Sequence, residues 1–155
     1  MASLAAKPPK TLDQHYRIYR KQFVAMIGKL CININIYAGE KTIGSNLCQQ
    51  LSDSTMSLMD YYVSYLSSKG MEKPFDNQQF IMTMVVCFWI IMKFSMDDCL
   101  DSKGVLKCFG TPTFSKKNLA EKELEILDSI DFNICSFMPK PKLQQTEKMI
   151  VYCAN

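Results

Sequence analysis

The feature that most constrains the fold of this chain is an apolar run over residues 80–92, interrupted only by Thr83. The run is too short for a membrane-spanning helix, which needs about 20 apolar residues, and its length is typical of a buried helix in a globular core. Asp76 or Asn77 can cap its N-terminus, and the helix is expected to end near Met96. Because a helix that is apolar on every face must be surrounded by other elements, the run predicts a fold built around one central helix.

The flanking sequence supplies the helices that would cover the central one. Apolar residues at spacings of three and four mark one face of a helix. On this criterion the sequence predicts an all-α domain, a five-helix bundle around the buried helix with an extra N-terminal helix before it. The predicted helices and helical turns cover residues 12–30, 40–50, 54–69, 77–96, 100–108 and 116–130.

Three boundaries depend on short local patterns. Residues 31–37 alternate isoleucine with asparagine, which is a period typical of a strand. Asp53 or Ser54 can cap the helix that follows, which would separate it from the one before, and Ser115 can cap the last helix. Residues 1–10 are expected to be a disordered N-terminus and residues 136–155 a C-terminal tail, so the predicted domain spans residues 11–135.

Composition excludes several classes of protein. The chain has 155 residues and a net charge of +3, and its basic residues form no strong cluster, so its composition argues against nucleic acid as a partner. Its seven cysteines are odd in number and contain no CxxC pair, which favours reduced, mostly buried thiols over a disulfide framework or a zinc ribbon. Reduced thiols and the absence of a signal-peptide pattern predict a nuclear or cytoplasmic protein without membrane association.

No pattern of residues indicates catalysis. His15 is the sole histidine, and no cysteine is framed as a nucleophile. Asp97, Asp98 and Asp101 lack the ligand spacing and the glycine of a calcium loop, and no glycine-rich phosphate loop occurs. The sequence therefore predicts a protein that is not an enzyme and that uses no cofactor, no metal and no small-molecule substrate.

Two charged residues stand out because apolar residues surround them. Lys93 ends the central apolar run, and Glu123 lies on the inward edge of the last helix, four positions from Leu119 and from Leu127. Charges beside apolar surface are costly unless they are paired. One interpretation is that the two snorkel at the rim of the core or pair with each other. The other is that they point out of the domain together and bind a partner.

Three segments in order resemble parts of one known helical domain, the cyclin box. Residues 51–68, LSDSTMSLMDYYVSYLSS, are similar to its second helix, which ends in Leu-Ser-Ser. Residues 88–96, FWIIMKFSM, resemble the end of its third helix, where cyclins carry Ala-x-Lys-Phe-Glu-Glu. Residues 114–134, FSKKNLAEKELEILDSIDFNI, are the strongest match and resemble its fifth helix. The resemblance covers residues 50–134 and is that of a single, divergent box, as in reduced or virus-encoded cyclins.

The resemblance implies a regulatory subunit that binds, and activates, a cyclin-dependent protein kinase. The kinase-binding Lys and Glu of the family fall on Lys93 and Glu123. Further family contacts fall on Phe94 and Phe132, and Ile134 follows two positions later; for these three an ordinary core position is an equal alternative. Sequestration of the kinase without activation would look the same in the sequence.

Departures from the family leave a second class of function open. Residues 33–40 lack the substrate-docking motif that the first helix of cyclins carries, and Val63 stands where an Asp pairs with an Arg in the family. The alternative is a cyclin-fold transcription adaptor that binds polymerase or DNA. Such an adaptor would need a clustered basic face, of which this chain shows little.

Overall fold

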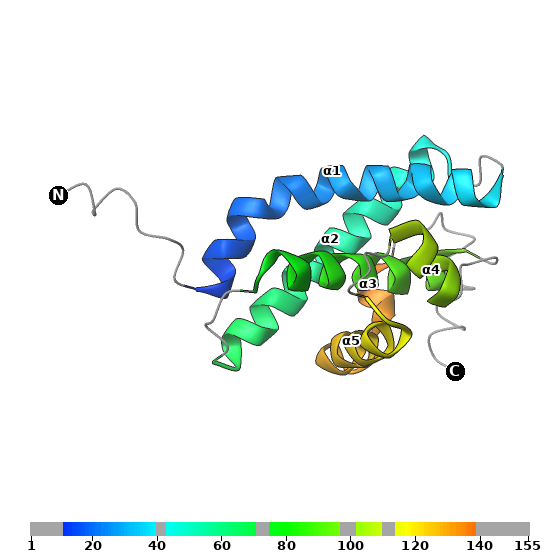
Figure 1. Ribbon diagram of the computed structural model, residues 1–155. Coiled ribbons are helices and arrows are strands. Elements are labelled where there is room, and N and C mark those ends of the chain that lie inside the picture. The colour runs from blue at the N-terminus through cyan, green and yellow to red at the C-terminus, as the bar shows by residue number, and fades with distance from the viewer. Residues whose placement is uncertain (1–10, 40–42, 71–74, 97–101, 110–113, 139–155) are drawn as a thin grey trace.

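The computed structural model describes residues 11–39, 43–70, 75–96, 102–109 and 114–138 (Figure 1). These residues form five α-helices and a short 3₁₀ helix, η2, and they contain no strand, which confirms the all-α class. The elements are α1 (Leu12–Ala38), α2 (Ser45–Ser68), α3 (Asn77–Ser95), α4 (Ser102–Phe109), α5 (Lys116–Ser129) and η2 (Ile134–Phe137). Most of the expected N-terminal and C-terminal tails, and the aspartates at 97, 98 and 101, lie outside the described residues.

The predicted central helix is α3. Every residue from Thr83 to Met92 is buried, and α3 packs against α1, α2 and α5. In Figure 1 α3 lies between α1, along the top of the view, and α5, at the bottom. By length and composition alone α3 would also qualify as a membrane span, but most of its apolar window is buried against the other helices, as in the core helix of a soluble domain.

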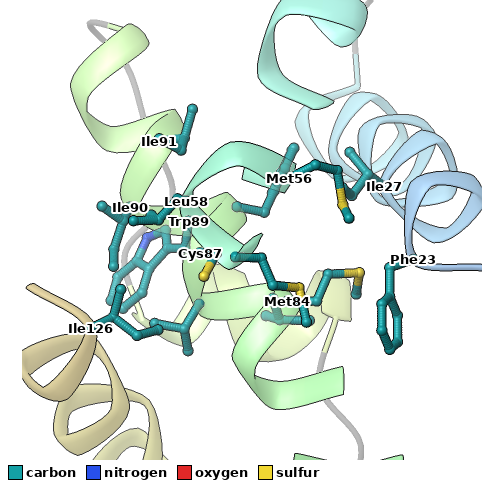
Figure 2. Packing of buried hydrophobic residues seen from close by; sticks show 14 of the residues in the cluster. Phe23, Ile27, Met56, Leu58, Met84, Cys87, Trp89, Ile90, Ile91 and Ile126 are labelled. Atoms are coloured by element: carbon teal, nitrogen blue, oxygen red, sulfur yellow. The ribbon is translucent and has the colours of Figure 1, made fainter. Parts of the chain in front are cut away.

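The core continues on both sides of α3. Figure 2 shows Met84 directed toward Phe23 and Ile27 of α1, and Trp89 directed toward Ile126 of α5. All five side chains belong to one buried apolar cluster. Because α3 contributes side chains to both sides of this cluster, it determines how far α1 and α5 lie from each other.

Two of the predicted helix starts are confirmed by their caps. The Asp76 side chain accepts a hydrogen bond from the backbone of Gln79, and the Gln79 side chain accepts one from the backbone N–H of Asp76. Ser115 and Asn118 form the same reciprocal arrangement at the start of α5. Each of these reciprocal arrangements is a capping box, which satisfies backbone donors that a helix N-terminus leaves unpaired. The two boundaries are therefore set by residues close together in the sequence.

The prediction of a strand-like segment over residues 31–37 is wrong, because α1 continues as a helix to Ala38. Residues two apart on a helix are about 200° apart around its axis, so the alternating isoleucines lie on opposite sides of α1. Here Ile34 is buried, whereas Ile32 and Ile36 are exposed. The Asn35 side chain supports the end of α1 by two hydrogen bonds with the backbone of Ile43, at 2.8 and 3.0 Å.

The predicted break near Asp53 is also wrong, since α2 runs without interruption from Ser45 to Ser68. Ser54 is buried inside this helix, and the Asp53 carboxylate accepts a hydrogen bond from Gln49 one turn earlier, so neither residue acts as a cap. The described residues therefore hold five α-helices, because the single helix α2 covers a segment where two helices were expected. Residues that can cap a helix also occur within one when their side chains find helical or buried partners.

A polar cluster joins α1 to α2. The Arg20 guanidinium binds the Asp60 carboxylate through two hydrogen bonds, at 2.8 and 2.9 Å, and the Tyr16 hydroxyl donates to the same carboxylate. Val63, one turn after Asp60, is buried in the apolar core. An Arg–Asp pair thus links the first two helices, but its acid is Asp60 and not the residue at position 63, where the family carries its Asp.

The prediction that all seven cysteines are reduced is wrong for Cys135, which is disulfide-bonded. Four others are free thiols, Cys31, Cys48, Cys87 and Cys108. Burial raises the pKa of the Cys31 thiol to about 12, with a further contribution from the neighbouring Cys48 thiol.

Candidate partner-binding site

The structure brings Lys93 and Glu123 into direct contact. Lys93 lies in the last turn of α3, and Glu123 lies in the middle of α5, which packs against α3. The Lys93 Nζ donates a hydrogen bond to Oε1 of Glu123 and forms a salt bridge with it. Two residues thirty positions apart, each selected from the sequence for its apolar surroundings, thus meet at one seam between helices.

The Lys93–Glu123 pair is only partly exposed, with side-chain exposures of 27% and 19%. The ammonium also lies 4.0 Å from the centre of the Trp89 ring, which adds a cation–π interaction. Each charge therefore lies beside apolar surface, and each is compensated by the other. This arrangement is the internal pairing that the sequence analysis left open as one of its two interpretations.

The pair retains unused hydrogen-bonding capacity. An ammonium group carries three donors, and a carboxylate has about four acceptor positions. The hydrogen bond between them joins Nζ of Lys93 to Oε1 of Glu123, which uses one donor of the ammonium group and one oxygen of the carboxylate. The site can thus offer both donors and acceptors to an approaching chain without first breaking the internal pair.

A second lysine, Lys122, lies at the other edge of α5, and its sequence context did not single it out. Its side chain is only 13% exposed, forms a salt bridge with Glu125 at 3.1 Å, and lies 5.7 and 5.5 Å from the ring centres of Tyr62 and Phe75. Burial, with a contribution from the Glu125 charge, raises the pKa of Tyr62 above its ordinary value. Tyr62 belongs to α2 and Phe75 lies just before α3, so helical spacing on α5 alone did not reveal these partners.

The three further residues implied by the resemblance differ in accessibility. Phe94 and Phe132 are both exposed, and Phe132 retains 56% of its surface in contact with solvent. Ile134 is buried in the core, on η2. The structure therefore leaves the two phenylalanines accessible to a partner, whereas it assigns Ile134 to the packing of the domain.

Phe132 has an unusual backbone conformation as well. Its φ is +60°, in the left-handed region, and its N–H donates a hydrogen bond to the carbonyl of Leu127 at 2.8 Å. A residue with a Cβ atom loses about 1–2 kcal/mol in this conformation. The turn after α5 thus holds a large apolar side chain in a strained conformation and exposes it to solvent.

No group of three or more His, Cys, Asp or Glu side chains that could hold a metal ion occurs in the part of the chain that the structure describes. Comparison with models of protein families, with curated protein sequences and with solved structures finds no match for this chain. The site is therefore defined by its own geometry. It consists of an ion pair between α3 and α5, with one exposed phenylalanine in the last turn of α3 and another in the turn after α5.

Proposed function

We propose that this protein is a cyclin-like regulatory subunit with a single cyclin-box fold that binds, and activates, a cyclin-dependent kinase through the Lys93/Glu123 face. The observation that supports this proposal is the contact between Lys93 and Glu123 across α3 and α5. The resemblance to cyclins names the same two residues as a kinase-binding pair. An all-α domain around one buried helix is consistent with that fold.

The ion pair would serve this function by binding polar groups of the kinase backbone. Its two charges already neutralise each other, so docking a partner over them requires less desolvation than docking over an isolated charge. The remaining donors of Lys93 and acceptors of Glu123 can then replace the water that a kinase segment loses on binding. Charge-assisted hydrogen bonds of this kind are about twice as strong as neutral ones.

The exposed phenylalanines would supply the apolar part of the interface. Phe94 directly follows Lys93, and Phe132 lies in the turn after α5. Aromatic residues are enriched at the anchoring positions of protein interfaces. The strained conformation of Phe132 has no compensating burial within the described chain, and contact with a partner would provide one.

Activation would follow from differential binding. A rigid helical domain that binds the active arrangement of a kinase more tightly than the inactive one shifts the kinase population toward the active form. A shift from 1% to 99% active would need about 5.5 kcal/mol of difference in binding free energy. A domain that binds both forms equally would occupy the kinase without activating it.

The test measures binding of the purified chain to a panel of purified cyclin-dependent kinases by biolayer interferometry, together with kinase activity on a peptide substrate. Lys93→Ala and Glu123→Ala should each weaken binding by about 2–5 kcal/mol, because a desolvated kinase group loses its partner. Lys117→Ala and Glu121→Ala are the matched controls, since these residues form an exposed pair on the same α5 helix. The controls should leave binding unchanged.

A charge-swap variant separates a binding role from a structural one. Lys93→Glu combined with Glu123→Lys restores the internal pair but reverses which group each helix presents. If the pair binds the kinase, the swap should recover much of the stability and none of the binding. Full binding by the swap variant, or binding of polymerase or DNA in place of any kinase, would contradict the proposal.

A further inference from the structure

Exposed apolar side chains are concentrated on α1. Nine large hydrophobic residues are exposed in the described part of the chain, and five of them belong to this helix. The isoleucines at 18, 32 and 36 are 58%, 59% and 72% exposed. The five residues are Ile18, Val24, Ile32, Ile36 and Tyr37.

The three isoleucines lie on one side of α1. Ile18 and Ile32 are fourteen positions apart, with the exposed Ala25 midway, and Ile36 follows one turn after Ile32. Residues seven and four apart share a helix face, so these four positions form a stripe, here called the outer face of α1. The stripe extends over about 27 Å, from a rise of about 1.5 Å per residue. Figure 1 shows α1 along one side of the bundle.

Nothing within the described domain accounts for this composition. Exposed isoleucines gain no burial, and their branched side chains favour a helix less than alanine or leucine does. Gly28 lies inside the same helix, where glycine is less stable than alanine. A Cβ atom at Gly28 would meet no other atom within 4 Å, so the domain's own packing does not require a glycine there. A glycine with space above it is suited to the close approach of a second helix.

The charges on α1 indicate the kind of helix that would fit. The helix contains four basic residues and one acid, and that acid, Asp13, is paired with Arg17. Lys21 and Lys29 are exposed beside the outer face and form no salt bridge within the described residues. A second copy of this chain, packed antiparallel along α1, would place these lysines near one another. Like charges at such a contact are unfavourable, so an acidic partner fits better than a second copy.

We propose that the outer face of α1 binds an amphipathic helix of a partner protein whose apolar stripe is flanked by acidic residues. The apolar stripe would pack on Ile18, Ile32 and Ile36, and the acidic flanks would pair with Lys21 and Lys29. This docking surface is separate from the Lys93/Glu123 face, and it does not depend on binding of a kinase.

The probe is a synthetic helical peptide of three heptads, with leucine at the core positions and glutamate at the flanking ones. Its control is the same peptide with lysine in place of each glutamate. Fluorescence anisotropy with the full chain should show at least tenfold tighter binding of the acidic peptide, and its affinity should fall as salt is raised. Equal affinity for both peptides, or binding of neither, would overturn the proposal.

Three variants locate the peptide on the chain. Ile32→Asp should weaken binding of the acidic peptide at least tenfold, whereas Leu124→Asp should leave it unchanged, because Leu124 is equally exposed but belongs to α5. Gly28→Ala should raise the melting temperature of the chain and still weaken its binding of the acidic peptide several-fold, since the added methyl group separates the two helices. A Gly28→Ala variant with undiminished binding would contradict close approach at this position and overturn the proposed docking geometry.

Two further measurements distinguish the alternatives. Sedimentation of the chain alone should show a monomer; a dimer that is lost in Ile32→Asp would mean that a second copy covers the outer face, and would overturn the proposal. Lys93→Ala should bind the acidic peptide as the unmodified chain does. Loss of kinase binding in the same variant would then be an effect on the Lys93/Glu123 face and not on the outer face of α1.

Discussion

Breaking the Lys93–Glu123 pair is expected to destabilise the fold more than breaking a surface ion pair would. Exposed pairs contribute about 0–1 kcal/mol to stability, and removing one partner of a fully buried pair costs about 3–5 kcal/mol. With side-chain exposures of 27% and 19%, this pair lies between the two limits. The Trp89 ring adds about 0.5–2 kcal/mol that Lys93 would lose and Glu123 would not. We therefore expect about 2–3 kcal/mol for Lys93→Ala and about 1–2 kcal/mol for Glu123→Ala.

The measurement is a double-mutant cycle, in which urea unfolding followed by circular dichroism gives the free energy of unfolding of four proteins: the unmodified chain, each single variant and the double variant. Residues in contact show coupling energies of about 0.5–3 kcal/mol, and we expect about 1–2 kcal/mol for this pair. At this chain length each kcal/mol corresponds to about 2–4 °C in melting temperature. Lys117→Ala and Glu121→Ala form the control cycle, because that pair is exposed and its coupling should be about 0.2–0.5 kcal/mol.

A coupling energy no larger than that of the control cycle would refute this reasoning. It would mean that the seam between α3 and α5 is solvated enough to screen the two charges. A large coupling energy with equal losses of unfolding free energy in the two single variants would support the ion pair, but it would contradict a separate contribution from the Trp89 ring.

Three other perturbations have expected outcomes. Phe88→Ala should cost about 3–5 kcal/mol in urea unfolding, because Phe88 is fully buried, whereas Phe94→Ala at the exposed end of the same helix should cost under about 1 kcal/mol; equal losses would show that the core is misplaced. Asp60→Ala should cost about 1–3 kcal/mol, since two side chains of α1 donate to that carboxylate, and Asp13→Ala, which removes a pair within one helix, should cost under about 0.5 kcal/mol. Because burial raises the pKa of Cys31 from 9.0 to about 12, the unfolded chain loses this proton first, and the free energy of unfolding should fall as the pH rises from 9 to 12; urea midpoints that stay constant from pH 8 to pH 10.5 would contradict this.

Those parts of the fold that depend on local chemistry could be predicted from the sequence. The apolar run predicted a buried α3, because a segment without a polar side is stable only when other elements surround it. Ser115 and Asp76 marked the starts of two helices, because their side chains satisfy backbone donors a few positions away. Apolar neighbours also identified Lys93 and Glu123 as charges in unusual surroundings, without showing what they contact.

The tertiary structure decided the features that depend on contacts between distant segments. Residues 31–37 are helical, with Ile34 in the core and Ile32 and Ile36 outside it, although the alternation of residue types alone favours a strand. The same holds for the aromatic contacts of Lys122, which come from α2 and from the segment just before α3. Helical periodicity determines which side of a helix a residue occupies, but the packing of the helices determines what that side meets.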